Sequence, residues 1–161
     1  MRGKDNARSG GEILIDQLSI HGVRHAFCVP GESYLAALDA FYGSDIALTV
    51  CRHESAAAIM AEAVGKITGR PGICFVTRGP GATNASAGVH IARQDSSPMI
   101  VFVGQVGRDT RSRSISSGSA ITTGPGRPLH AVWKARATIS GMRDGSSISV
   151  AHFAIEPNTA R

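Results

Sequence analysis

The sequence has few aromatic residues, few cysteines and no long apolar run. Aromatic residues are 5% of the 161-residue chain, which is typical of an α/β core of Ala, Val and Ile and not of an interface rich in Trp or Tyr. The cysteines, Cys28, Cys51 and Cys74, are odd in number and widely spaced. They therefore indicate reduced, buried thiols and exclude a disulfide framework or a zinc site. No stretch approaches the roughly 20 apolar residues that span a bilayer, and no signal peptide is recognisable at the polar N-terminus. We expect a cytoplasmic protein with no membrane partner.

An excess of positive charge is present, but it is unevenly placed. The formal net charge is +5. From Ser112 onward there are six Lys or Arg against two Asp or Glu, so 6 − 2 = +4 of that charge lies in the last 50 residues. The preceding part is nearly neutral and has no basic face with interleaved aromatics. The composition therefore predicts no nucleic-acid partner.

Apolar periodicity predicts alternating helices and strands between residues 11 and 111. Helical spacing covers residues 11–21, 32–43, 54–68 and 82–93, and apolar runs typical of buried strands cover residues 25–29, 46–51, 72–77 and 98–104. This order predicts an α/β fold, a three-layer parallel sheet with helices on both faces.

The two ends of the chain differ from this central domain. Residues 1–10 are polar, and we expect them to be disordered. Residues 112–161 are rich in Ser, Thr and Gly and have no sustained helical or strand period until Ala131, so we expect a poorly ordered tail. The domains predicted are thus 1–10, 11–111 and 112–161.

Ligands of a parallel sheet bind at the carboxyl ends of its strands. Those ends are residues 29–32, 51–54, 77–81 and 104–106. The segment from Thr77 to Asn84 has glycines on both sides of Pro80, which let backbone approach a ligand. On spacing alone a structural turn explains this segment better than a binding site does. It lacks the Gly-Lys-Ser/Thr of a P-loop and a dinucleotide-binding fingerprint.

Glu54 lies directly after the second predicted strand, at the start of a helix rich in Ala. Its carboxylate can complement the helix dipole, worth about 0.3–1 kcal/mol, or it can hydrogen-bond a cofactor, and the residue alone leaves both open. His21, His25 and His90 have no partner at metal-ligand spacing, so no metal site is predicted. The serines lack the G-x-S-x-G turn of a hydrolase.

The ordered set of motifs resembles the N-terminal pyrimidine-binding domain of thiamine-diphosphate enzymes, in particular the acetolactate synthase and decarboxylase group. The resemblance covers about residues 11–111. The elements that carry it are Val29-Pro30-Gly31-Glu32, Arg52-His53-Glu54 with Ala56-Ala57, Gly79-Pro80-Gly81-Ala82-Thr83-Asn84, Asp95-Ser96-Ser97-Pro98 and Gly104-Gln105-Val106.

The resemblance implies a role for each of these loops in binding thiamine diphosphate. Glu54 would hydrogen-bond N1′ of the aminopyrimidine and so promote activation of the thiazolium, which attacks a 2-keto acid. Around it, Pro30, Gly31 and Glu32 would flank the pyrimidine or substrate, and Gln105 would face the active centre. The turn of Gly79, Pro80, Gly81 and Asn84 would lie beside the cofactor.

Other parts of such an enzyme are not recognisable in this sequence. Members of the group hold the diphosphate through Mg²⁺ with a separate domain that has a Gly-Asp-Gly motif, and they are homo-oligomers. No such motif occurs here. The expected partner is therefore a diphosphate-binding domain or subunit, and we expect the isolated chain to be inactive, so whether it is itself an enzyme stays open.

Three explanations of the short chain are open. The tail after residue 111 can be a frameshifted segment of a truncated enzyme, which the other reading frames of the gene would test. The chain can be one subunit of a two-chain 2-keto acid decarboxylase, for which a neighbouring gene should encode the Gly-Asp-Gly partner. It can also be a non-catalytic α/β interaction module, in which case it would bind no thiamine diphosphate even with a partner domain.

Overall fold

A computed structural model describes residues 8–105, 138–139 and 147–153. The strands are β1 (His25–Cys28), β2 (Ala47–Val50), β3 (Gly72–Val76), β4 (Met99–Gln105), β5 (Thr138–Ile139) and β6 (Ser147–Phe153). The helices are α1 (Gly10–Ile20), a 3-10 turn η1 (Glu32–Tyr34), α2 (Leu35–Tyr42), α3 (Glu54–Thr68), α4 (Pro80–Asn84) and α5 (Ser86–Gln94). No described helix is long and apolar enough to cross a membrane.

The sheet confirms the predicted parallel arrangement of the first four strands. Its order is β2-β1-β3-β4-β6-β5, and β1 pairs in parallel with both β2 and β3, while β3 pairs in parallel with β4. Phe27 on β1 is opposite Cys74 on β3, which is opposite Val101 on β4. β1, β3 and β4 are therefore interior strands, each paired on both sides, and β2 is an edge strand.

Two further strands lie within the segment for which no regular structure was expected. β6 pairs antiparallel with β4 along its whole length, and β5 pairs antiparallel with β6. The rest of residues 106–161 lies outside the described residues, as do residues 1–7, so the expected low order of both ends stays a prediction.

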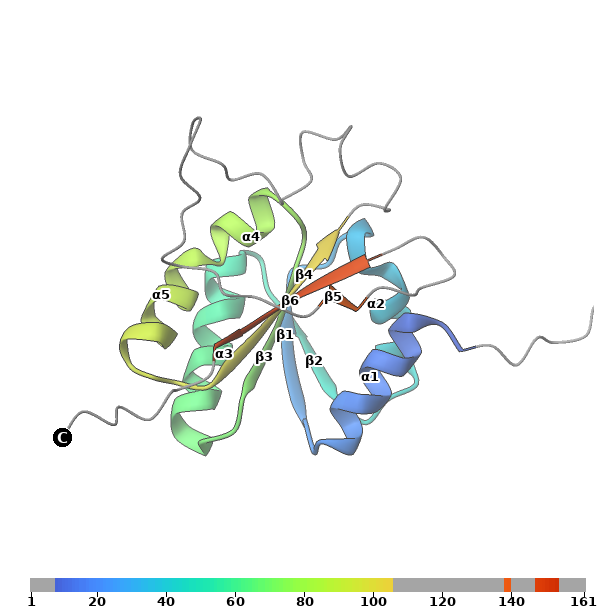
Figure 1. The fold of residues 1–161 in the computed structure, drawn as a ribbon, viewed down its shortest axis with the longest axis horizontal. Helices are drawn as coiled ribbons and strands as arrows, with labels where there is room; N and C mark the ends of the chain where they lie inside the picture. Colours follow the sequence, from blue (N-terminus) through green and yellow to red (C-terminus); the bar gives the residue numbers. More distant parts are fainter. Residues whose placement is uncertain (1–7, 106–137, 140–146, 154–161) are drawn as a thin grey trace, which may run out of the picture.

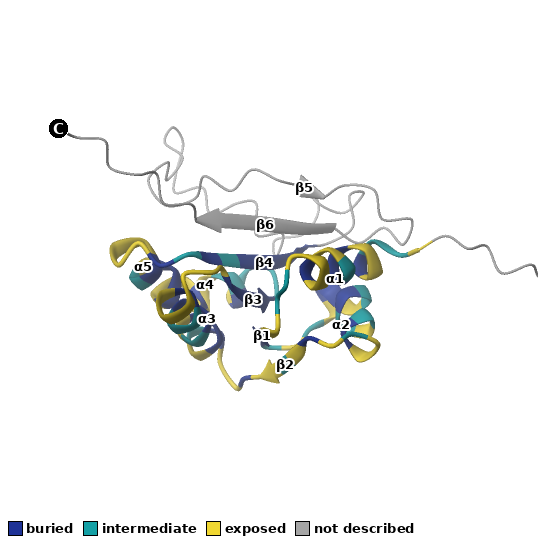
Figure 2. Cartoon of the chain, turned by 90° about the horizontal axis from the view of Figure 1, so that it is seen from below, coloured by how far each residue is buried: buried dark blue, intermediate teal, exposed yellow. Residues whose placement is uncertain are grey.

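Helices cover both faces of the sheet, as predicted. Figure 1 shows α1 and α2 on one face and α3, α4 and α5 on the other. Two buried clusters follow this division. One joins Leu14 and Phe41 to Phe75, and the other joins Ala58 and Val89 to Cys74. All three cysteines are free and buried, as expected. In Figure 2, β4 is buried along its length whereas β2 is largely exposed.

Local sequence signals explain where the helices begin and end. Ser9 accepts a hydrogen bond from the Glu12 backbone, and the Glu12 side chain accepts one from the Ser9 backbone, so α1 begins with a capping box. α3 ends at Gly69, whose φ of +67° lies in the left-handed region that glycine adopts without strain.

Two predicted helices are each divided in the structure. The continuous helix expected over 82–93 is instead two helices, α4 and α5, which meet at the buried Ala85. α4 begins earlier than expected, because Pro80 occupies its first turn. The helix expected over 32–43 begins as the 3-10 turn η1. Its last residue, Tyr34, is buried and donates from its hydroxyl to the Val29 carbonyl, and its backbone departs from helical geometry.

Candidate functional site

The carboxyl ends of β1 and β3 form the point where the chain changes direction across the sheet. From β1 the chain passes through α2 to β2 on one side, and it then returns through α3 to β3 on the other side of β1. In open α/β sheets a crevice forms at such a reversal, outside the carboxyl ends of the strands. The predicted site residues follow these strands.

Glu54 lies at this edge, buried and held by hydrogen bonds. It is the first residue of α3 and is 8% exposed. Asn84 Nδ2 donates to Glu54 Oε2 over 3.0 Å, although the two residues are 30 positions apart. Ser55 Oγ in turn donates to the Asn84 carbonyl over 2.6 Å. The structure thus joins the start of α3 to the end of α4 around one carboxylate.

Gly81 leaves space beside the other carboxylate oxygen. A Cβ atom at Gly81 would lie 3.2 Å from Glu54 Oε1 and 2.3 Å from Thr77 Oγ1, so a side chain here would fill the surroundings of the carboxylate. Gly79, with φ of +55°, turns the chain into α4, and Pro80 follows at the start of that helix. Asn84 and Gly81 therefore border the Glu54 carboxylate, and Gly79 and Pro80 belong to the same turn.

The loop after β1 packs against the loop after β3. A Cβ atom at Gly31 would lie 2.1 Å from Thr77 Cγ2, which shows how closely the backbone of the first loop approaches the second. Pro30 is exposed at the tip of this loop. The structure therefore brings Pro30, Gly31 and Glu32 to the same edge as Glu54, without a direct hydrogen bond to its carboxylate among the described residues.

An ion pair links the same two loops. Arg78 Nη1 lies 2.7 Å from Glu32 Oε1, with the Arg78 side chain 21% exposed and that of Glu32 68% exposed. The pKa of the Glu32 carboxyl is lowered by a hydrogen bond from its own backbone and by the charge of Arg78. Sequence reasoning did not single out Arg78. Its position within the glycine-rich loop is the signal that could have done so.

Gln105 completes this edge at the end of β4. It is 8% exposed and is the last residue of β4, the strand that pairs with β3. Among the described residues, it lies at the same edge of the sheet as Glu54 but outside the hydrogen-bonded unit of Glu54 and Asn84.

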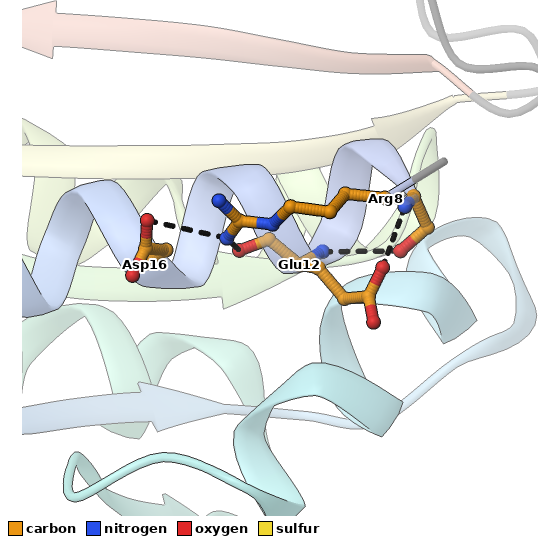
Figure 3. Close-up of polar contacts among 4 residues, drawn as sticks. Arg8, Glu12 and Asp16 are labelled. Atoms are coloured by element: carbon orange, nitrogen blue, oxygen red, sulfur yellow. Dashed lines mark hydrogen bonds and ion pairs between the residues drawn. The ribbon is translucent and has the colours of Figure 1, made fainter. Parts of the chain in front are cut away.

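A surface hollow of about 430 Å³ lies elsewhere on the molecule. It lies between α1 and α2 and includes Glu12, Asp39 and Asp45 in its lining. Arg8 forms an ion pair with Asp16 at 3.2 Å beside the Ser9 and Glu12 capping box (Figure 3). These contacts stabilise the start of α1 and have no connection with Glu54. The described residues contain no group of three or more metal-ligating side chains.

Comparison with known proteins identifies the family. The sequence profile described as "Thiamine pyrophosphate enzyme, N-terminal TPP binding domain" matches residues 8–125. The chain belongs to the thiamine pyrophosphate enzyme family. It is this family's N-terminal, cofactor-binding domain, with acetolactate synthases among its relatives, so the resemblance found in the sequence is confirmed.

The similar proteins are much longer than this chain. The acetolactate synthase of Bacillus subtilis (strain 168) is 41% identical over 102 residues, which are 63% of this chain and 18% of the relative. The probable acetolactate synthase large subunit of Methanocaldococcus jannaschii is 43% identical over 97 residues, 60% of this chain and 16% of the relative. The mitochondrial acetolactate synthase catalytic subunit of Aspergillus candidus is 43% identical over 100 residues, which are 62% of this chain and 14% of the relative. The chain thus spans less than a fifth of the length of these relatives.

The residues around Glu54 fit the cofactor of the family. A buried carboxylate with one oxygen fixed by Asn84 and the other beside a glycine offers an acceptor for a protonated ring nitrogen. Among the described residues, Glu54 with Asn84 and Gly81 thus provides a buried acceptor of this kind.

Proposed function

We propose that this chain binds the aminopyrimidine half of thiamine diphosphate, with Glu54 as the hydrogen-bond partner of N1′. The observation that carries the proposal is the buried Glu54 carboxylate at the carboxyl edge, oriented by Asn84 and bordered by Gly81. A helix-dipole role alone would not require burial, because an exposed carboxylate in the first turn already interacts favourably with the dipole.

Asn84 and Gly81 border different oxygens of the Glu54 carboxylate. Asn84 holds Oε2 by donating to it, which leaves Oε1, on the Gly81 side, to accept a hydrogen bond from N1′. Burial keeps water from competing for the carboxylate, and this strengthens a hydrogen bond to a charged acceptor. When bound, thiamine diphosphate supplies a thiazolium carbon that adds to the carbonyl group of a 2-keto acid.

The proposal extends to a partner that completes the site. A diphosphate-binding domain or subunit would hold the diphosphate through Mg²⁺, as part of a 2-keto acid decarboxylase or acetolactate synthase-like enzyme. Support comes from the length of the relatives, of which this chain covers less than a fifth. On α3, Ile59 and Ile67 are 41% and 84% exposed, and this apolar surface is suited to contact with such a partner or with a second copy of the chain.

Binding of thiamine diphosphate to variants of the chain tests the proposal. In an NMR titration at millimolar ligand we expect Glu54→Gln to lose the binding that the original chain shows, by about ten-fold or more, because a hydrogen bond to a charged group is lost. Glu62→Gln is the matched control. Glu62 is a second buried glutamate of the same helix, bonded to Ser97, and its variant should bind normally.

Two results would contradict the proposal. One is equal affinity of Glu54→Gln and the original chain. The other is measurable decarboxylation of pyruvate by the isolated chain, since half of the cofactor site would then have to be dispensable.

A further inference from the structure

Arg78 has hydrogen-bonding capacity that the described residues do not use. Its Nη1 is engaged by Glu32, whereas its Nε is buried and has no acceptor among those residues. A buried donor without an acceptor is costly, and such groups are uncommon unless a ligand or water satisfies them. The guanidinium therefore presents a donor for which the described residues supply no acceptor.

The geometry of a guanidinium specifies the chemistry of that group. The five N–H donors lie in one plane, and Nε together with the neighbouring Nη binds both oxygens of a carboxylate in parallel. Nη1 lies at a different edge of the planar group from the Nε–H group, so the ion pair with Glu32 does not engage the Nε–H group. A planar anion with two oxygens is the ligand that fits.

Glu32 is positioned to occupy Arg78 only loosely. Its side chain is 68% exposed, while that of Arg78 is 21% exposed. An ion pair with one partner largely in water contributes little, commonly below about 1 kcal/mol, so it offsets little of the attraction of the guanidinium for a second anion. The next residue, Ser33, is 5% exposed, and its hydroxyl also lacks a hydrogen-bond partner in the described chain.

The loop of Arg78 is the loop that borders Glu54. Its neighbour Thr77 is in close approach to both Gly31 and Gly81, and Gly81 borders Glu54 Oε1. We propose that Arg78 binds the carboxylate of an anionic 2-keto acid substrate at this edge through its Nε side, and that Glu32, bound at Nη1, is an internal counter-ion that competes with the substrate for the charge of the guanidinium. The proposal rests on the proposed function for the location of the reaction, and it adds a substrate-binding residue to it.

The nearest alternative ligand of the same charge is the phosphate of a cofactor. The test therefore compares pyruvate, its neutral amide and inorganic pyrophosphate. Each is titrated into the ¹⁵N-labelled chain while the Nε–H resonance of Arg78 and, for the variants that lack it, the backbone amide resonances of the same loop are followed by NMR. We expect saturable shifts with pyruvate and none with the amide.

Variants of the ion pair give opposite expected changes. Arg78→Gln should weaken pyruvate binding by about ten-fold or more, because a charge-assisted bidentate contact is lost. Arg78→Lys should restore binding only in part, since an ammonium group lacks the planar fork. Glu32→Gln should strengthen binding by about two- to five-fold, because the internal competitor is removed. Lys66→Gln, which removes a cation from the exposed pair with Asp95, controls for net charge and should change nothing.

Several results would overturn the inference. They are unchanged pyruvate binding in Arg78→Gln, the absence of any pyruvate-dependent shift, and a response to pyrophosphate but not to pyruvate. Thiamine diphosphate binding measured on the same Arg78→Gln sample separates the two proposals. If Arg78→Gln loses pyruvate binding but keeps cofactor binding, both the Arg78 and the Glu54 proposals are supported. The Glu54 proposal fails if Glu54→Gln leaves cofactor binding unchanged.

Discussion

The helices on the two faces of the sheet contact it through side chains of different size. On the face of α1 and α2 the core is made of large residues, with Phe75 stacked on Phe102 at 4.6 Å between ring centroids and meeting Phe41 edge-on at 5.3 Å. On the face of α3 and α5 the core consists mainly of Ala, Val and Cys. A Cβ atom at Gly88 of α5 would lie 2.6 Å from the Cβ of Ala58 on α3.

The two faces have different roles: the large residues supply most of the stability, and the small residues fix the positions of the helices. Large side chains bury the most apolar area and contribute most of the hydrophobic stabilisation. Small residues let backbones approach closely, so a helix has little freedom to shift. The small-residue face is the one that carries Glu54 and Asn84, whose hydrogen bond depends on the relative position of α3 and α4. The two faces should therefore respond to opposite kinds of substitution.

The largest expected effect is a cavity on the large-residue face. Phe75→Ala should lower the free energy of unfolding by about 3–5 kcal/mol, because Phe75 is fully buried and contacts three other aromatic rings. Urea unfolding followed by circular dichroism measures it. A loss below about 1 kcal/mol would mean that this face does not dominate the stability.

An added methyl group should be harmful on the small-residue face. Gly88→Ala should cost about 1–3 kcal/mol, since its Cβ would also lie 2.7 Å from the Ala58 backbone carbon. Gly43→Ala is the control, because nothing lies within 4 Å of its added Cβ and its φ is −94°. It should stay within about 0.5 kcal/mol of the original chain. Equal effects at both glycines would remove the distinction between the faces.

Both faces should lose stability in alkaline solution. Burial raises the pKa of Cys28 on the large-residue face to about 11 and that of Cys74 on the small-residue face to about 12, from 9.0. The folded state keeps protons that the unfolded state loses, so this stabilisation is complete below pH 9 and declines as the pH rises toward the folded pKa values. Between pH 9 and 10 the loss is at most about 1.4 kcal/mol for each thiol.

Urea unfolding at several pH values measures this decline. Cys74→Ala should make the slope shallower, and a slope equal to that of the original chain would show that Cys74 does not contribute. Because Cys74 has the higher pKa in the folded state, its contribution to the loss of stability should continue to a higher pH than that of Cys28.

The smallest effect concerns how the helices of the two faces begin. α1 is fixed by the Ser9 capping box, a local device, so Ser9→Ala should cost about 1 kcal/mol. Glu54→Gln at the start of α3 should cost less stability than that while it abolishes cofactor binding. If Glu54→Gln instead destabilised the fold more than Ser9→Ala, its role would be mainly structural.

The sequence predicts most of the fold but less of the site. Alternating apolar runs and helical spacing correctly indicate the first four strands and their parallel arrangement. The division between α4 and α5 was not predicted, because the residues around Ala85 have continuous helical spacing and only the packing of the buried Ala85 shows where the helices meet. The antiparallel pairing of β6 with β4 was missed as well, since the Ser- and Gly-rich composition of residues 112–128 led to the expectation of a poorly ordered tail, although polar and apolar residues alternate from Ser147 to Val150.

The contacts within the site were likewise not predicted from the sequence. Sequence motifs indicated Glu54 and Asn84 separately, but their hydrogen bond spans 30 positions and depends on how α3 and α4 pack. The ion pair between Arg78 and Glu32 was not predicted, because it joins two loops that become neighbours only when β1 pairs with β3.

The sequence by itself determined which residues form strands and helices and which polar groups follow each strand. These properties depend on local periodicity, glycine and proline, which each segment carries within itself. Only the tertiary structure decided that β1 lies beside β3, that Gly31 packs against Thr77, and that Glu54 is buried between Asn84 and Gly81. These contacts join segments distant in the chain, and their formation depends on packing of the whole sheet with its two helical layers.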